Sequence, residues 1–314
     1  MRFDSASGGV IPALSGQALL ALVPDLTKSA EVDVMDFSLL PGPHMTPPRM
    51  FELVGFIRSR LDQPEQAGVV VTHGTDTLEE CAYLAGLLLH SSKPVVFVGA
   101  MRNSSDAGWD GPINLRSALR VAISEEGKGL GVLVVMNQQI LSSWDATKMD
   151  TDAVGAFEAR DLGALGMVER DQVTILRRPT QVSGQYVNAS VLEERVEIVK
   201  LSAGSNGRVL DFLLENGYRG VILEGLGLGN VPVTAVKSIQ RAVQSGVPVV
   251  LTSRCPRGRV LDTYAYEGGG HNLRQMGVIL GGLLPSHKAR LKLMLLLGAG
   301  QDLGAIRKAF EEVD

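Results

Sequence analysis

The sequence predicts an α/β protein: two α/β domains, a larger N-terminal one with a doubly wound, mostly parallel sheet and a smaller C-terminal one. Short apolar runs rich in β-branched residues alternate with helical patterns, which is typical of buried parallel strands joined by helices. This alternation weakens after Gly166 and resumes at Val196. The length of 314 residues is enough for about two domains.

The N-terminal domain is expected at residues 1–180. Buried runs such as GVVVT and PVVFVG mark its strands, and Pro112 suits the first turn of a helix. Its predicted elements are helix 15–24, strand 31–37, helix 47–61, strand 68–72, helix 77–90, strand 94–99, helix 112–123 and strand 131–137. Only Val10 and Ile11 have strand character before the first helix. A doubly wound sheet that opens on a helix lacks its first strand, which would leave edge groups exposed.

A linker is expected at residues 181–195, because residues 171–195 carry scattered polar and turn residues. The C-terminal domain is expected at 196–314. Its predicted elements are strand 196–201, helix 207–216, strand 220–223, helix 234–245, strand 248–252 and a helical C-terminus. Gly217 and Gly246 stand where glycines commonly end helices.

The composition excludes several classes. Apolar residues make up 45% and charged residues 20%, which excludes disorder, collagen and coiled coil. The net charge of −4 gives no basic surplus for a nucleic-acid partner. No apolar stretch of about 20 residues or signal-like start suggests a membrane span or secretion. Two cysteines are too few for a disulfide framework, so a cytoplasmic location is expected.

The strongest local signal is the segment 72–80, THGTDTLEE, between a buried strand and a helix. Thr77 and Glu80 have the spacing of a capping box, and Gly74 permits a tight turn. Thr75 and Asp76 then lie at the helix N-terminus, which favours negative charge. Asp76 could hold the ammonium group of a small zwitterion, with the helix end facing its carboxylate or an oxyanion. An ordinary helix-capping turn is the alternative.

Two other polar segments each allow a functional and a purely structural interpretation. Lys148, in SSWDATKMD, could act as a base or activate a threonine hydroxyl, or it could be a solvated surface lysine. Asp106 and Asp110 could orient side chains or simply make the turn before a helix.

Cofactor and metal chemistry are not expected. GLGLGN at 225–230 has the spacing G-x-G-x-G, and no Asp or Glu between 231 and 261 could bind a ribose, so a strand-ending turn is favoured. The five histidines and two cysteines show no zinc-ligand spacing, and no G-x-S-x-G elbow is present.

Taken together, the motifs resemble those of the bacterial L-asparaginase (asparaginase/glutaminase) family, in order along nearly the whole chain. The matching segments are HGTDTLEE at 73–80, KPVVFVGAMR at 93–102, DGPINL at 110–115, TKMDTDAVGAFEARDLGALG at 147–166, GLGLGN, VPVVLTSRCPRG and PSHKARLKLMLLL.

The resemblance implies a cytoplasmic amidohydrolase of asparagine catabolism that releases ammonia from asparagine, with a glutaminase side activity possible. The family uses two threonines, an aspartate and a lysine; Thr75, Asp76 and Lys148 match the second threonine, the aspartate and the lysine. Asp76 would bind the substrate amino group, beside Gly74. The family forms homodimers or homotetramers whose sites a neighbouring subunit completes, and Asn230 matches that contribution. Glu267 matches it less closely, because YAYEGGG departs from the family pattern.

Two further departures lie in the N-terminal domain. Gly42 stands where the family has a substrate-binding serine, so that hydrogen bond must come from the backbone or be lost. The motif T-G-G-T-I, which carries the first threonine and nucleophile, is absent from the 314 residues, and the resemblance begins just after it. We therefore expect that the natural protein extends upstream of Met1 and that this chain alone is poorly stable and close to inactive.

Three alternatives stay open at this point. The first is a pseudoenzyme of the same fold that binds an amino acid without turnover. The second is a nucleotide-dependent oxidoreductase using GLGLGN, against which the missing ribose carboxylate argues. The third is a role in supplying ammonia to a tRNA-linked reaction, against which the lack of an extra domain or basic surface argues.

Overall fold

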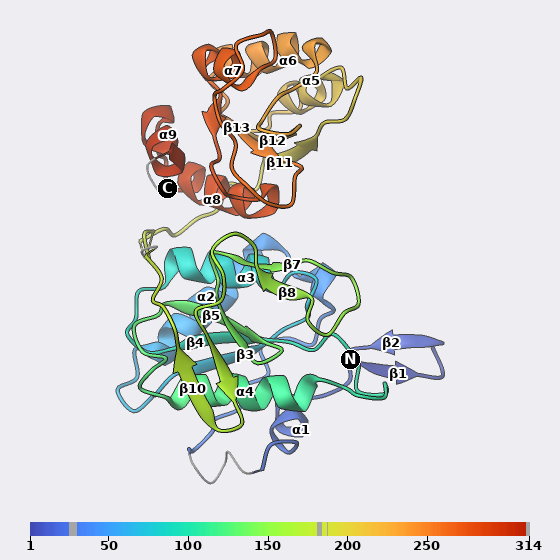
Figure 1. The fold of residues 1–314 in the computed structure, drawn as a ribbon, viewed down its shortest axis with the longest axis vertical. Coiled ribbons are helices and arrows are strands. Elements are labelled where there is room, and N and C mark those ends of the chain that lie inside the picture. Colours follow the sequence, from blue (N-terminus) through green and yellow to red (C-terminus); the bar gives the residue numbers. More distant parts are fainter. Residues whose placement is uncertain (25–29, 181–183, 187, 312–314) are drawn as a thin grey trace. The chain divides into compact units, whose positions relative to one another are not determined.

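The computed structural model describes residues 1–24, 30–180, 184–186 and 188–311. The chain divides into two compact units, unit 1 at residues 1–187 and unit 2 at residues 188–314 (Figure 1). The predicted class of two α/β domains is confirmed, since each unit has its own sheet flanked by helices. Residues 181–183 and 187 of the predicted linker, and 312–314 of the predicted C-terminal domain, lie outside the described residues.

Unit 1 is built on a six-stranded sheet of order β10-β9-β6-β5-β4-β3, which is mixed and not mostly parallel as the sequence predicts. Pairs β3–β4 and β4–β5 are parallel, and the remaining pairs are antiparallel. The strands are β3 (Val69–Thr72), β4 (Val95–Val98), β5 (Val132–Met136), β6 (Gln139–Ser142), β9 (Gly166–Glu169) and β10 (Gln172–Ile175). A separate hairpin comprises β7 (Ala146–Lys148) and β8 (Phe157–Ala159).

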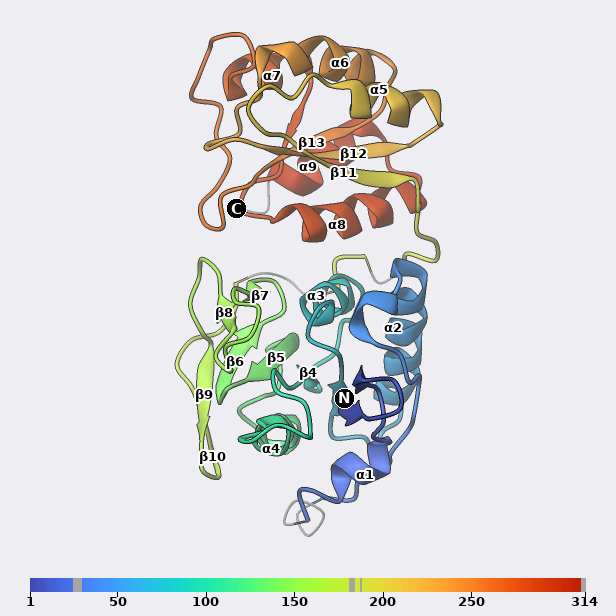
Figure 2. The same cartoon turned by 90° about the vertical axis from the view of Figure 1, so that its right-hand side faces the viewer.

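Three of the four α-helices described in unit 1 cover the two faces of this sheet. The four helices are α1 (Gly16–Leu20), α2 (Pro47–Leu61), α3 (Leu78–Leu88) and α4 (Gly111–Ile123). Helices α2 and α3 lie on one face and α4 on the other (Figures 1 and 2). Because α3 and α4 join successive neighbouring strands across opposite faces, one of the two crossovers has the uncommon left hand.

The core of unit 1 lies around its central strands. All residues of β4 and β5 are buried, as the uninterrupted apolar runs predict, and α3 buries most of its length. Strand β3 is at the edge of the sheet, and Val69–Val71 are only half-buried. Its carboxyl end therefore delivers the segment 73–77 to the border of the sheet.

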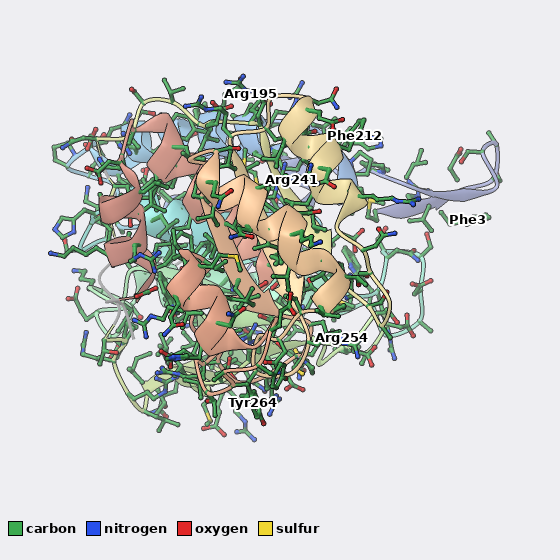
Figure 3. The ribbon with its side chains drawn as sticks, turned by 90° about the horizontal axis from the view of Figure 1, so that it is seen from above. Phe3, Arg195, Phe212, Arg241, Arg254 and Tyr264 are labelled. Carbon is green, nitrogen blue, oxygen red and sulfur yellow. The ribbon has the colours of Figure 1, made fainter. Side chains whose placement is uncertain are left out.

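The start of the chain differs from the prediction. Strands β1 (Arg2–Asp4) and β2 (Gly9–Ile11) form a two-stranded hairpin outside the main sheet, which projects from unit 1 and carries Phe3 (Figure 3). The turn is made by Asp4, whose carboxylate accepts the Ser7 N–H at 2.8 Å. Three-residue strands are too short to give a periodic signal, which is why the sequence pattern missed them.

Two other predictions in unit 1 are wrong. Residues 31–37 form no strand, because their acidic side chains bind helix residues instead: Asp33 pairs with Arg60, and Asp36 accepts the Gly16 N–H at 2.8 Å. The stretch 171–195 is not wholly a connecting segment, since β10 lies within it. Its strand pairs with β9 through a turn in which Arg170 has a φ of 53°.

Unit 2 has a four-stranded parallel sheet of order β11-β12-β13-β14. The strands are β11 (Val196–Lys200), β12 (Gly220–Gly225), β13 (Val249–Ser253) and β14 (Ile279–Leu280). The helices are α5 (Arg208–Glu215), α6 (Val233–Gln244), α7 (Gly270–Met276), α8 (Ser286–Gly298) and α9 (Leu303–Glu311). Gly217 and Gly246 both adopt a φ of about 74° after helix ends, which explains glycine there.

The core of unit 2 packs α5, α6 and α7 onto its sheet, with α8 and α9 on the other face (Figures 1 and 2). Helices α5 and α6 are also tied at the surface, where Arg241 pairs with Asp211 at 2.5 Å; Figure 3 labels Arg241 and the exposed Phe212 there. Across the described residues of both units, every helix is too short or too polar to pass through a membrane.

Candidate active site

The candidate site lies where β3 gives way to α3. Strand β3 ends at Thr72, and the His73 N–H still donates to the Val98 carbonyl of β4 at 2.8 Å. Residues 74–77 then turn into α3, which begins at Leu78. The turn therefore stands at the carboxyl edge of parallel strands, where open α/β sheets bind ligands.

Lys148 meets two of the predicted residues there. Its Nζ donates to Thr75 Oγ1 at 3.0 Å and to Asp76 Oδ1 at 2.7 Å, across more than 70 residues of chain. The Lys148 side chain is only 17% exposed, whereas that of Asp76 is 56% exposed. Lys148 is thus no solvated surface lysine, and the Asp76 carboxylate stays open to a ligand.

The β7–β8 hairpin carries Lys148 to this position. Lys148 pairs with Phe157 in the hairpin, and the Met149 N–H donates to the Ala156 carbonyl at 2.7 Å. Asp145, buried at the start of the hairpin, accepts the Asp161 and Leu162 N–H groups at 3.0 and 2.7 Å. These bonds fix the end of the hairpin from which the Lys148 side chain extends.

Gly42 lies directly beside Asp76. A Cβ added at Gly42 would stand 3.4 Å from Asp76 Cβ and 3.5 Å from its backbone nitrogen, and one added at Gly74 would stand 3.0 Å from Gly42 Cα. The absence of a side chain at Gly74 therefore lets the 3₁₀ turn at Gly42–His44 pack closely against the segment before α3. The structure thus brings together five predicted residues of unit 1: Gly42, Gly74, Thr75, Asp76 and Lys148.

The expected capping box does not form. Thr77 is the N-cap residue of α3, but its hydroxyl makes no cap bond and donates instead to the Gly42 carbonyl at 2.8 Å. The hydroxyl is thus used to fasten the Gly42 turn onto the helix start. The Thr77 side chain therefore does not occupy the N–H groups of the first turn of α3, which together with the helix dipole favour negative charge at this end.

His73 precedes this turn and was not singled out by sequence reasoning. Its Nδ1 lies 2.8 Å from the Gly74 carbonyl oxygen, and its ring centroid is 6.3 Å from that of Phe97. Burial lowers the pKa of the His73 imidazole below its ordinary value, while the bond to Gly74 acts weakly in the opposite direction. The imidazole is therefore neutral near pH 7.

Two other residues were overlooked. Glu79, buried in the first turn of α3, accepts the Lys148 N–H at 3.4 Å. Asn114 donates to the Gly99 carbonyl at 3.1 Å and accepts the Asn137 N–H at 3.0 Å, which ties the ends of β4 and β5. The sequence signals that could have found them are their places in the motifs HGTDTLEE and DGPINL and in the first turns of α3 and α4.

The two aspartates of the 103–114 loop make turns. Asp110 is buried and accepts the N–H groups of Met101 and Arg102 at 3.0 and 2.9 Å, and Asn114 Nδ2 at 2.8 Å. Asp106 accepts the Asn103 N–H at 3.0 Å on the surface. Both carboxylates shape the loop that follows β4 through these bonds to its own backbone N–H groups.

The remaining two predicted residues lie in unit 2, on adjacent loops. Leu226 and Asn230 exchange two backbone hydrogen bonds of 2.8 Å in the turn after β12, so GLGLGN is a strand-ending turn. The Val231 N–H donates to the Gly268 carbonyl at 2.8 Å, which sets Asn230 beside the loop of the exposed Glu267. Asn230 Oδ1 is buried and has no hydrogen-bond partner among the described residues.

The site brings a hydroxyl, an amino group and a carboxylate into contact at the N-terminus of α3. Groups of these three kinds can act together as a nucleophile, a base and a charged group that orients a substrate. Within the described ranges, no cluster of three or more His, Cys, Asp or Glu side chains could hold a metal ion.

Comparison with known proteins decides the family. Residues 1–181 match the N-terminal domain described as "Asparaginase, N-terminal", and residues 195–310 match the "Glutaminase/Asparaginase C-terminal domain". The chain belongs to the L-asparaginase family.

Individual members of the L-asparaginase family agree with this over nearly the whole chain. A probable L-asparaginase of Deinococcus radiodurans is 36% identical over 98% of this chain and 95% of its own length. The L-asparaginase of Bacillus licheniformis is 33% identical over 91% of this chain and 88% of its own. The crystal structure of a probable cytoplasmic L-asparaginase from Campylobacter jejuni has a TM-score of 0.86 at 29% identity, covering 94% of this chain and 93% of that one.

Proposed function

We propose that this L-asparaginase-family amidohydrolase hydrolyses the side-chain amide of L-asparagine to L-aspartate and ammonia, using a threonine hydroxyl as nucleophile. One observation carries the proposal: Lys148 Nζ contacts both Thr75 Oγ1 and Asp76 Oδ1 at the N-terminus of α3. Thr75 supplies the hydroxyl in this proposal, because it is the hydroxyl that Lys148 Nζ contacts at 3.0 Å.

The proposed reaction has two steps. Lys148 Nζ takes the Thr75 hydroxyl proton as Oγ1 bonds to the amide carbon. The carbon–nitrogen bond then breaks, and the nitrogen leaves as ammonia with the proton that Lys148 returns. Water next attacks the ester, which frees aspartate and restores the Thr75 hydroxyl. The N–H groups of the first turn of α3 would stabilise the oxyanion.

Asp76 has the role of binding the substrate ammonium group. Its carboxylate accepts a hydrogen bond from Lys148 Nζ at Oδ1, and more than half of the side chain is exposed. Gly74 and Gly42 line the approach to it, and Gly42 provides space in place of a hydroxyl. A glutaminase side activity would need room for one more methylene between the amide and the ammonium group.

The proposal extends to assembly and location. Asn230 and Glu267 stand on adjacent loops of unit 2, and we propose that they complete the site of a neighbouring subunit in a homodimer or homotetramer. The absence of a hydrogen-bond partner for the buried Asn230 Oδ1 among the described residues supports this proposal, because buried polar atoms usually have one. A cytoplasmic location is proposed because Cys81 and Cys255 are both free thiols.

The test of the function is ammonia release from asparagine, with glutamine assayed in parallel. We expect Lys148→Ala and Thr75→Val to lower kcat about 10²- to 10⁴-fold, the range typical of acid–base groups. Thr75→Ser keeps the hydroxyl and should retain most activity. Lys128→Ala is the matched control, because Lys128 is an exposed lysine paired with Glu125 away from the site.

Calorimetry separates this function from the pseudoenzyme alternative. If the chain binds asparagine or aspartate, loses that binding on Asp76→Ala, and releases no ammonia, it is an amino-acid-binding protein that lacks a competent nucleophile. If turnover survives Thr75→Val, the assignment of Thr75 as nucleophile is wrong. The subunit contribution would be contradicted by a monomer that retains full activity in size-exclusion chromatography fractions.

A further inference from the structure

His73 precedes Thr75 and Asp76 in the chain but is not one of the residues that Lys148 Nζ contacts. Its backbone is fixed to the sheet, because the His73 N–H donates to the Val98 carbonyl at 2.8 Å. Its ring folds back onto the following residue, where Nδ1 lies 2.8 Å from the Gly74 carbonyl oxygen. The ring is therefore held between the sheet, near Phe97, and the turn that carries Thr75.

The contact with Gly74 fixes the tautomer of His73. A carbonyl oxygen can only accept a hydrogen bond, so Nδ1 carries the hydrogen. Nε2 is then the unprotonated nitrogen, and it is buried with no hydrogen-bond partner in the described part of the chain. A proton on Nε2 would have no acceptor there, so the surroundings favour one neutral form of the ring.

The hydrogen bond from His73 Nδ1 is made to the carbonyl of the peptide that links Gly74 to Thr75. The peptide linking Gly74 to Thr75 is planar, so fixing its oxygen also fixes the direction of the Thr75 N–H on the opposite side. Other backbone segments approach residues 73–75 closely at two points. A Cβ at Gly74 would stand 3.0 Å from Gly42 Cα. A Cβ at Gly99 would stand 2.8 Å from the His73 carbonyl oxygen and 3.0 Å from Thr75 Cγ2. His73 supplies the hydrogen bond that sets the orientation within this packing.

We propose that His73 is a positioning residue, whose Nδ1–H fixes the Gly74–Thr75 peptide plane and thereby the direction in which Thr75 and Asp76 face Lys148. This inference rests on the proposed function of that group. His73 itself transfers no proton and touches no reacting atom.

The test compares variants that keep or lose the donor at Nδ1. Asn places its amide nitrogen about where Nδ1 stands, Gln places its own nearer Nε2, and Leu fills the space without a donor. We expect His73→Leu and His73→Gln to lower kcat about 10- to 100-fold, as small misplacements of catalytic groups do. His73→Asn should restore kcat to near the wild-type value at a similar melting temperature. His90→Leu, at an exposed histidine, is the control.

The outcomes separate this inference from the function on which it rests. If the wild type releases no ammonia but binds aspartate, the binding constant replaces kcat: His73→Leu should weaken binding about tenfold and His73→Asn should not. Equal impairment of the Asn and Leu variants, or losses that follow melting temperature alone, would overturn the positioning role. If His73→Leu fails to fold, the comparison of Asn with Gln decides. A wild type that neither turns over nor binds aspartate overturns both.

Discussion

At the scale of single residues, the site depends on where side chains are absent. Gly74 needs its lack of a side chain, because a Cβ would meet the backbone of Gly42 at 3.0 Å. Gly42 does not, since a Cβ there meets Asp76 and Gly74 only at ordinary contact distances of 3.4 to 3.5 Å and its φ is not left-handed. The backbone at position 42 could therefore carry a side chain, and the glycine there leaves space beside Asp76.

This difference predicts opposite results for two serine substitutions. Gly74→Ser should lower the free energy of unfolding by about 1–3 kcal/mol, because backbone must move to admit the Cβ. Gly42→Ser should change it by less than about 0.5 kcal/mol and act on KM for asparagine, since its hydroxyl would lie beside Asp76. Urea unfolding and steady-state kinetics measure the two effects. A strongly destabilised Gly42→Ser protein would contradict the packing described for that turn.

At the scale of elements, a short hairpin sets the position of the lysine. Strands β7 and β8 have three residues each, too few for backbone pairing alone to hold them firmly. The buried carboxylate of Asp145 adds two hydrogen bonds from the Asp161 and Leu162 N–H groups. Lys148, three residues further along, is held in place through this anchor.

We expect Asp145→Asn to lower the free energy of unfolding by about 1–3 kcal/mol, because the NH₂ group of the new amide, at a buried position, would face one of the two N–H donors instead of accepting from it. The kcat for asparagine should fall as well, because the backbone that carries Lys148 is no longer held in place. Asp150→Asn is the matched control: the exposed Asp150 accepts the Asp152 and Ala153 N–H groups through a single oxygen, which asparagine retains. Equal losses of stability in the two variants would refute the anchoring role.

At the scale of the whole molecule, the chain consists of two units with separate sheets and cores. Both tryptophans, Trp109 and Trp144, belong to unit 1, as does the buried Cys81. Burial raises the pKa of the Cys81 thiol, so it stays protonated and unreactive until unit 1 opens. Cys255 of unit 2 is exposed and reports no unfolding.

Because each unit has its own sheet and core, we expect the two units to unfold in separate transitions, which these probes can distinguish. Tryptophan fluorescence and labelling of Cys81 should follow one urea transition, whereas far-UV circular dichroism should include a second one from unit 2. Cys255→Ser removes the background of labelling at the exposed thiol. A single transition that all three probes share would show instead that the two units unfold as one cooperative block.

The elements that the sequence predicted correctly are those with a strong burial pattern. Strands β4, β5, β12 and β13 are continuous apolar runs, and their observed bounds lie within about two residues of the expected ones. The pattern failed at 31–37, where alternating acids mimic a strand but bind helices, and at the short strands of the hairpins. A pattern of burial cannot reveal strands whose stability comes from a few distant contacts.

The sequence by itself determined the alternation of strands and helices, the turn at 73–77 and the family, because each depends on residues close together in the chain or on an ordered set of motifs. Only the tertiary structure decided that Lys148 reaches Thr75 and Asp76, that Thr77 binds the Gly42 carbonyl instead of capping its helix, and that His73 turns back onto Gly74. The physical reason is that local periodicity fixes which face of an element is buried. The partner of a polar side chain depends instead on which distant segment folding brings within hydrogen-bond distance.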